Sequence, residues 1–204
     1  MPTPTGNENL SQALTIAQSI CWDETHGYTM GADMDPDTDC SGFVGYALSH
    51  AGFNVPQRWD TTTMIPTLMT YPGFAHYIWY PGMQLQHGDI FVYDEGGGAN
   101  GHTFFYAENV NGYTDDTANT DTTGMLSTAR IEAASSRDQP HPGDQAKNGT
   151  GAHWEVWVHP YSAPSTSHTW HLFRWHGGAQ PQLTPVQIAM FHKKNRPFIR
   201  KVFL

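Results

Sequence analysis

Two cysteines occur in this chain, and the surroundings of Cys40 are those of a nucleophile. Cys40 follows Asp39 and precedes Ser41, at the start of a helix predicted over residues 41–51. A helix N-terminus offers unpaired N–H groups and the positive end of the helix dipole, and both favour a thiolate over a thiol. Asp is a good N-cap and Cys a poor one, so capping accounts for Asp39 but not for Cys40. We therefore predict that Cys40 is a nucleophile and that Cys21 is a buried thiol.

A thiolate nucleophile needs a group that accepts and returns a proton, and His102 is the candidate for this task. It opens a predicted strand directly after the glycine-rich loop 96–101. A His at that position could aim its imidazole across the sheet at a helix N-terminus. The chain contains 12 His, and most of the others lie in predicted loops or beside prolines, so position distinguishes His102.

A third polar group orients the imidazole in such sites, and Glu132 is the candidate. Strand alternation places its neighbour Ile131 on the core face and Glu132 on the opposite face. We expect its carboxylate to accept the Nδ1–H of His102, which leaves Nε2 facing Cys40. A solvent-facing Glu on an edge strand explains the residue equally well. Three side chains in or beside predicted loops compete for the role: His141, His153 and Asn109.

Helices followed by strands must position these groups. Apolar spacing predicts helices over 10–22 and 41–51, and one short helix near 62–70. After residue 88 the apolar period changes to two, which predicts strands. These strands span 89–93, 102–110, 129–134, 155–158 and 170–175. The order indicates an α+β fold with a mostly antiparallel sheet of five to six strands.

The distribution of charge divides the chain into a domain over 1–178 and a basic appendage over 179–204. The formal net charge is −9, yet five of the ten Lys and Arg residues lie in the last twelve positions. All 19 acidic residues precede them. An acidic body argues against nucleic acid as the main partner, because phosphate contacts need Lys and Arg.

The N-terminal sequence carries neither a basic region nor an apolar stretch of the kind found in signal peptides. No apolar run approaches the ~20 residues that span a bilayer. We therefore expect no signal peptide and no membrane span.

Four segments in order resemble the NlpC-type papain-like cysteine peptidases, which cut the peptides of bacterial cell walls. The segments are Tyr28-Thr29-Met30-Gly31, Asp39-Cys40-Ser41-Gly42-Phe43-Val44, His87-Gly88-Asp89-Ile90-Phe91-Val92 and Gly101-His102-Thr103-Phe104-Phe105-Tyr106. The resemblance covers about residues 10–178 and implies a papain-like fold. It further implies that Cys40 attacks a carbonyl carbon, while His102 takes the thiol proton and returns it to the leaving amine.

The resemblance also implies substrate contacts. The backbone N–H of Cys40 and the hydroxyl of Tyr28 would form the oxyanion hole, while Asp39 and Ser41 would bind the free amine of a stem peptide. From the residues alone, the small Ser41 and Gly42 would also let a substrate backbone come close. The implied partner is bacterial peptidoglycan, cut at the D-γ-glutamyl to diamino-acid bond.

Three features depart from the family pattern. Glu132 stands where the family usually has a His, and Phe104 stands where it has a small Gly. The segments 111–128 and 135–153 are longer than a minimal domain needs. These differences concern the choice of substrate more than the chemistry.

The related CHAP class, which shares the Cys-then-His order, gives an alternative function: an N-acetylmuramoyl-L-alanine amidase or bridge endopeptidase with bound calcium. Asp33, Asp35 and Asp37 alternate just before the nucleophile and could offer oxygen ligands to Ca²⁺. The EF-hand pattern is not met, since its twelfth position is Val44 rather than Glu. An acidic solvated turn is the preferred interpretation, and we expect no cofactor.

An alternative of another class is a non-catalytic phage tail or wall-binding module, against which the intact Cys40 and His102 argue. A zinc site lacks its usual spacings, CxxC or HExxH. Without a signal peptide, a wall hydrolase fits a phage lysin made in the host cytoplasm, or a virion-associated enzyme.

Overall fold

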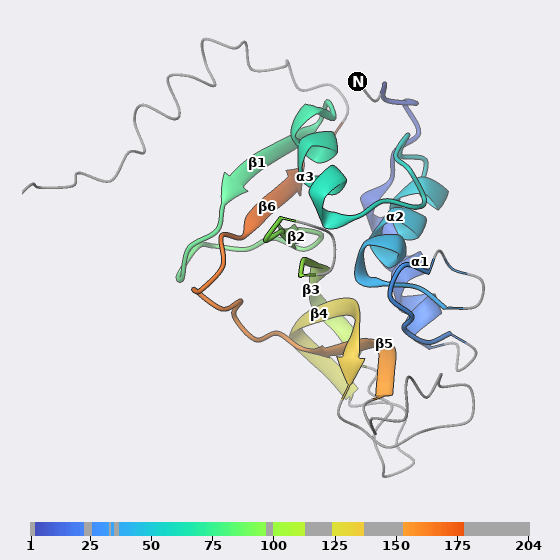
Figure 1. Ribbon diagram of the computed structural model, residues 1–204, viewed down its shortest axis with the longest axis vertical. Helices are drawn as coiled ribbons and strands as arrows, with labels where there is room; N and C mark the ends of the chain where they lie inside the picture. The colour runs from blue at the N-terminus through green and yellow to red at the C-terminus, as the bar shows by residue number, and fades with distance from the viewer. Residues whose placement is uncertain are drawn as a thin grey trace, which may run out of the picture.

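In a computed structural model of the protein, helices precede the strands and pack beside an antiparallel sheet (Figure 1). The structure describes residues 3–22, 26–32, 34, 37–96, 100–112, 124–136 and 153–177. The described helices are α1 (Leu10–Cys21), α2 (Cys40–His50) and α3 (Thr61–Thr70). The described strands are β1 (Phe74–Ile78), β2 (Ile90–Tyr93), β3 (His102–Gly112), β4 (Gly124–Ser136), β5 (His153–Pro160) and β6 (His171–Trp175).

The six described strands form one sheet in the order β1-β6-β2-β3-β4-β5, and every described pair is antiparallel. The α+β prediction with an antiparallel sheet of five to six strands is therefore confirmed. β1 was not predicted. It lies in a long connection that contains several prolines, and we interpreted that connection as irregular. Among the described strands, β1 pairs with β6 alone and lies at one end of the strand order.

Acceptor side chains fix where the helices begin. Asn9 accepts the backbone N–H of Gln12 at the start of α1, and Asp39 accepts that of Gly42 at the start of α2. Asp60 and Thr63 form a capping box at the start of α3. Because Asp39 is the N-cap, Cys40 is the first residue of α2, one position before the predicted start.

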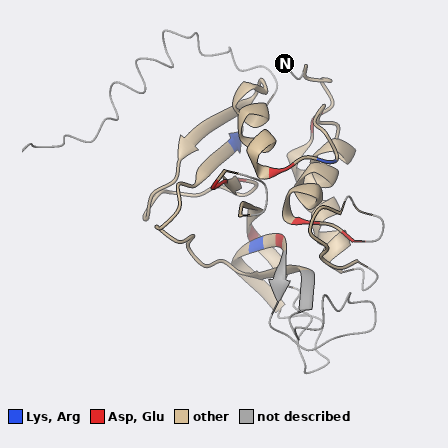
Figure 2. Ribbon diagram, in the orientation of Figure 1, with Lys and Arg blue, Asp and Glu red and all other residues tan. Residues whose placement is uncertain are grey.

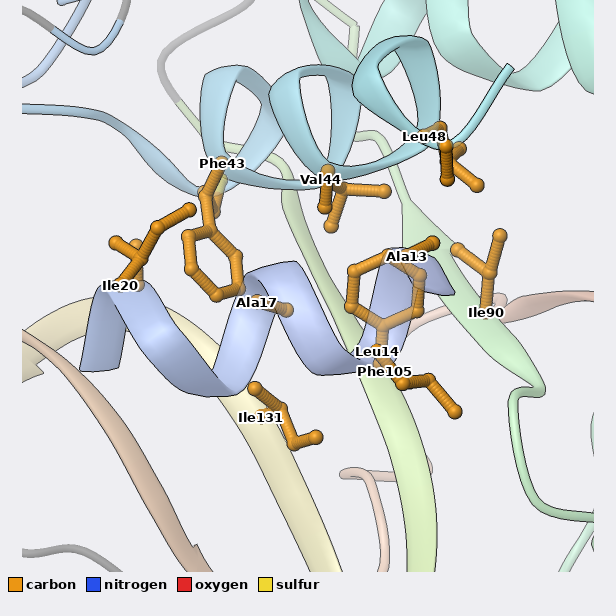
Figure 3. Close-up of a cluster of buried hydrophobic side chains, with 14 of the residues drawn as sticks. Ala13, Leu14, Ala17, Ile20, Phe43, Val44, Leu48, Ile90, Phe105 and Ile131 are labelled. Atoms are coloured by element: carbon orange, nitrogen blue, oxygen red, sulfur yellow. The ribbon is translucent and has the colours of Figure 1, made fainter. Parts of the chain in front are cut away.

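The main core lies between α1, α2 and the sheet. α1 contributes Leu14 and Ala17, α2 contributes Phe43 and Val44, and these contact strand residues such as Ile131 (Figure 3). The ring of Phe43 meets that of Phe105 edge-on at 6.5 Å between centroids. Packing of this kind holds the N-terminus of α2 against β3 and β4.

A second cluster includes the opposite face of β2 and β3, which explains why these strands are buried on both faces. Phe91 of β2 and Phe104 of β3 stack with their centroids 4.6 Å apart, beside Trp79 and Trp170. This cluster gives the physical reason for Phe104, which replaces a small residue of the family pattern. Its ring fills the second cluster and is fully buried.

A buried ion pair joins the start of β2 to β6. The Nε–H of Arg174 donates to Oδ1 of Asp89 at 2.8 Å, and its Nη2–H donates to Oδ2 at 2.6 Å. Asp89 is only 1% exposed, and it also accepts the backbone N–H of Gln86. The pair therefore links two central strands, β2 and β6, and β2 is the neighbour of β3, which carries His102.

We expect Asp89→Ala to lower the free energy of unfolding by about 3–5 kcal/mol, because it leaves a largely buried guanidinium without its partner. Urea unfolding would measure the loss. Glu95→Ala is the matched control, since Glu95 is 47% exposed in its pair with His168 and an exposed pair contributes at most about 1 kcal/mol. Equal losses in the two variants would contradict the prediction.

Among the described residues, none of the helices could span a membrane. The appendage 179–204 lies outside the described residues, so its separation from the domain stays a prediction.

Candidate active site

The N-terminus of α2 is built around the carboxylate of Asp39. Its Oδ1 accepts the backbone N–H of Gly42 at 2.7 Å and the hydroxyl of Ser41 at 2.8 Å. Its Oδ2 accepts the backbone N–H of Gly31 at 3.0 Å. These bonds fix the first turn of α2 and therefore the position of Cys40, which is 6% exposed.

Gly42 is needed for a different reason than the sequence indicated. A Cβ at this position would lie 2.8 Å from the carbonyl oxygen of Ala32 and 2.9 Å from Oγ1 of Thr38. The space on the Cβ side of Gly42 is thus filled by the chain's own loop, so this side offers no room for a substrate backbone. The small residue allows the segment before α2 to pack against the helix.

Tyr28 lies next to the predicted nucleophile. The backbone bridge between Tyr28 and Thr38 runs parallel and brings Tyr28 beside the segment that enters α2. Its hydroxyl is within hydrogen-bonding contact of both the side chain and the backbone of Cys40. Burial, and then the negative charges of Cys40 and Asp39, raise the pKa of Tyr28 well above its usual value. Its hydroxyl therefore remains protonated and able to donate.

The structure brings Cys40, His102 and Glu132 together from three separate elements. The imidazole of His102, at the start of β3, is hydrogen-bonded to the side chain of Cys40 at the start of α2. Its Nε2 lies 2.7 Å from Oε2 of Glu132 on β4. The His102 side chain is 20% exposed, whereas that of Glu132 is 5% exposed.

The predicted roles of the two ring nitrogens of His102 are reversed. Nε2, and not Nδ1, contacts Glu132, so Nδ1 is the nitrogen that remains for Cys40. The reason is geometric. Glu132 lies on the side of the imidazole ring that carries Nε2, the nitrogen farther from the His102 backbone. An Nε2–H donated to the carboxylate fixes the tautomer with Nδ1 free to accept the thiol proton.

Glu132 holds a second histidine that the sequence did not single out. Nε2 of His159, on β5, lies 2.6 Å from Oε1 of Glu132. Of the three residues considered as alternatives to Glu132, the structure describes the side chain of one. Asn109 is exposed towards the far end of β3, His141 lies outside the described residues, and the side chain of His153 is not described.

The charges of these groups support one another. Burial opposes a charged imidazole, but the hydrogen bonds and negative charges of Cys40 and Glu132 outweigh it and raise the pKa of His102 to about 10. Burial also favours a neutral carboxyl, but hydrogen bonds from His102 and His159 outweigh it and hold the pKa of Glu132 well below its usual range. The site thus favours an imidazolium at His102 beside a carboxylate at Glu132.

Basic and acidic residues adjoin on β4 at this point, as Figure 2 shows. They are Arg130 and Glu132, whose Nη1 and Oε2 are 3.7 Å apart. Arg130 donates instead to the carbonyl of Ser162, through Nε at 3.0 Å and Nη2 at 2.5 Å, and its guanidinium lies over the ring of Phe104. It therefore adds positive charge near Glu132 without a hydrogen bond to it.

Gly101 sets the position of His102 by close packing against α3. A Cβ at Gly101 would lie 1.9 Å from Oγ1 and 2.7 Å from Cβ of Thr61, the first residue of α3. No L-residue with a side chain fits there unless the loop or the helix moves. The glycine before His102 is thus part of how the imidazole is placed.

We expect Gly101→Ala to lower kcat roughly 10- to 100-fold, because displacing a catalytic group by about 1 Å has an effect of this size. Turnover of a small soluble stem peptide would measure it. Asn100→Ala, at the exposed neighbouring position, should leave turnover unchanged. Adding Thr61→Ala to Gly101→Ala removes two of the three contacting atoms and should restore part of the activity. Wild-type turnover in Gly101→Ala would show that His102 does not depend on this contact.

Of the predicted calcium ligands, Asp33 and Asp35 lie outside the described residues. Oδ2 of Asp37 accepts the hydroxyl of Thr29 at 2.8 Å. Within the described part of the chain, three or more His, Cys, Asp or Glu side chains do not gather in a way that could hold a metal ion. The calcium alternative thus stays untested.

A protein-family model matches part of this chain. The model of the NlpC/P60 family matches residues 25–120. This range contains Tyr28, Cys40 and His102, and it ends before Glu132. A search of curated proteins finds no match to this chain.

Proposed function

We propose that this chain is a cell-wall peptidase of the NlpC/P60 family, whose model matches residues 25–120, and that it hydrolyses an amide bond in peptidoglycan stem peptides with Cys40 as its nucleophile. The observation that carries the proposal is the chain of contacts from Cys40 through His102 to Glu132. A non-catalytic wall-binding module would not need a buried carboxylate aligned with the imidazole.

In the proposed reaction, the thiolate of Cys40 attacks the carbonyl carbon and forms a tetrahedral intermediate. The backbone N–H of Cys40 and the hydroxyl of Tyr28 would stabilise the oxyanion. The imidazolium of His102 then gives its proton to the leaving amine as the C–N bond breaks. Water, deprotonated by the now neutral His102, attacks the thioester, and the C–S bond breaks to release the acid and to restore the thiolate of Cys40 beside the imidazolium of His102.

Asp39 and Ser41 are proposed to bind the free amine of the stem peptide. The Ser41 hydroxyl donates to Asp39, and Ser41 is only 4% exposed. Asp39 already accepts three hydrogen bonds, and a carboxylate has about four acceptor sites. Asp39 is therefore the better candidate for the direct contact, with Ser41 holding its carboxylate in place.

The bond cut is proposed to be that between D-γ-glutamate and the diamino acid. Mass spectrometry of fragments from digested peptidoglycan tests this, because that cut leaves a new amine on the diamino acid. Fragments cut between muramic acid and L-alanine would instead support the CHAP-like amidase. Parallel digestions with EDTA and with Ca²⁺ test the proposal that no metal is needed, which loss of activity in EDTA and its return with Ca²⁺ would contradict.

The basic appendage 179–204 is proposed to serve wall binding and not the chemistry. We expect its deletion to weaken binding to purified walls, and the difference to shrink as salt rises, since salt screens exposed charges. Turnover of a small soluble stem peptide should stay unchanged. A folded, truncated protein that is inactive on that peptide would overturn the proposal. The phage origin stays a prediction.

A further inference from the structure

The carboxylate of Glu132 is shared between two histidines. Oε2 faces His102 at 2.7 Å, and Oε1 faces His159 at 2.6 Å. Glu132 is only 3% exposed, so neither oxygen can rely on bulk water. A buried carboxylate needs a hydrogen-bond donor for each oxygen, because an unsatisfied one is costly. His102 supplies the donor for one oxygen only.

His159 supplies the hydrogen bond to the second oxygen. Arg130 is committed to the carbonyl of Ser162 and stays 3.7 Å from the other oxygen of Glu132. Without His159, Oε1 would lose this bond. The carboxylate would then be free to turn, or to take up a proton, and its bond to His102 would weaken.

The sheet itself places His159. In the pairing of β4 with β5, Arg130 lies opposite His159 and Glu132 lies opposite Trp157. His159 therefore reaches Glu132 diagonally, on the same face of the sheet. The Trp157 ring lies against the imidazole, with centroids 4.6 Å apart, and the His159 side chain is 18% exposed. Its position is thus fixed by packing as well as by the hydrogen bond.

We propose that His159 is a positioning residue of the active site, which donates its Nε2–H to Glu132 and so holds the carboxylate that orients His102. This inference rests on the proposed function. His159 acts through Glu132 and touches neither the substrate nor Cys40. Its contribution is an N–H hydrogen bond to the carboxylate, so another N–H donor of similar reach should replace it.

The test compares His159→Ala and His159→Leu, which remove the donor, with His159→Gln, whose side-chain amide retains one. Two readouts are measured: kcat on a small soluble stem peptide, and the rate at which iodoacetamide alkylates Cys40 between pH 5 and 9. We expect the Ala and Leu variants to have a kcat roughly 10-fold lower than wild type, because each loses one hydrogen bond to a charged group. They should also slow alkylation at pH 6, because the imidazolium that accompanies the thiolate is less stable. The Gln variant should stay within about 2-fold of wild type in both kcat and the alkylation rate.

His50→Ala is the control for loss of an imidazole elsewhere, since His50 is exposed at the end of α2, where it stacks on Tyr46. It should change neither readout. A wild-type alkylation profile and kcat in the Ala and Leu variants would overturn the inference, as would a Gln variant as impaired as they are. Alkylation needs no substrate, so it separates the two proposals. If the wild-type protein cuts no stem peptide but the His159 variants still shift the alkylation profile, the positioning inference stands and the proposed function fails.

Discussion

Replacing Cys40 by Ala should abolish hydrolysis of purified cell walls and of soluble stem peptides, with kcat lower by at least about 10⁴-fold. The thiolate forms the bond to the carbonyl carbon, and no other group in the described site can do so. The fold should be retained, because Asp39 caps α2 through its own side chain. We expect the free energy of unfolding to change by no more than about 1 kcal/mol. Turnover, with circular dichroism as a check on folding, measures both effects.

Cys21→Ala is the matched control. Cys21 is 1% exposed in the core, and burial, followed by the negative charge of Glu132, raises the pKa of its thiol well above the usual value. Such a thiol is unreactive. Most activity should therefore remain after its replacement. If Cys21 proved essential and Cys40 dispensable, the assignment of the nucleophile would be wrong.

Replacing Glu132 should shift the pH dependence of activity in a direction that the charges fix. The carboxylate favours the charged form of His102, and so contributes to the rise of its pKa to about 10. In Glu132→Gln this contribution is lost while burial still favours neutral imidazole, so the pKa of His102 should fall. Because protonated His102 gives the proton to the leaving amine, the alkaline decline of kcat/KM should move to lower pH by about 1 unit or more. Rates on a soluble stem peptide across pH 5–10 measure it.

The size of the loss should separate the two substitutions at Glu132. Glu132→Gln keeps an oxygen acceptor for Nε2–H of His102, so we expect a roughly 10- to 100-fold loss of kcat. Glu132→Ala removes the acceptor and leaves two imidazoles without their partner, so the loss should be larger. Both should remain smaller than the loss in Cys40→Ala, because Glu132 orients and does not react. Wild-type activity and an unmoved pH profile in Glu132→Ala would remove this residue from the site.

The same bonds should make stability depend on pH, with opposite signs for the two groups. The raised pKa of His102 contributes stability that is fully present below about 6.5, its unfolded value, and is lost as pH rises towards about 10. The lowered pKa of Glu132 contributes stability above its unfolded value that is lost as the solution becomes strongly acidic.

Much of the fold could be predicted because its signals are local. The spacing of Leu14 and Ala17, and the N-cap Asp39, identified α1 and α2 almost to the residue. β1 was missed because its five residues do not alternate between buried and exposed positions, so a period of two does not mark them. Their pairing with β6 makes them a strand. Strand lengths were also underestimated: β4 runs over Gly124–Ser136, well beyond the predicted 129–134. The ladder with β3 and β5 extends it through residues with little strand signal of their own.

The site could be predicted where one residue stood out in its local context, and not where a contact depends on strand register. The helix start marked Cys40 and the glycine-rich loop marked His102, and the structure brings both together with Glu132. Which nitrogen of His102 faces Glu132 depends on the three-dimensional approach of β4, so the sequence led to the wrong one. His159 was missed because its signal is the diagonal pairing of β5 with β4, which nothing in the local sequence reveals.

Trapping the acyl-enzyme is the most direct test of a covalent thiol mechanism at Cys40. The protein would be mixed with a stem peptide, quenched in acid within the first turnover, digested and analysed by mass spectrometry. The peptide containing Cys40 should gain the mass of the acyl half of the substrate, and the corresponding peptide of Cys40→Ala should gain nothing. An acyl group on another residue would contradict the claim, as would full hydrolysis of the stem peptide by Cys40→Ala.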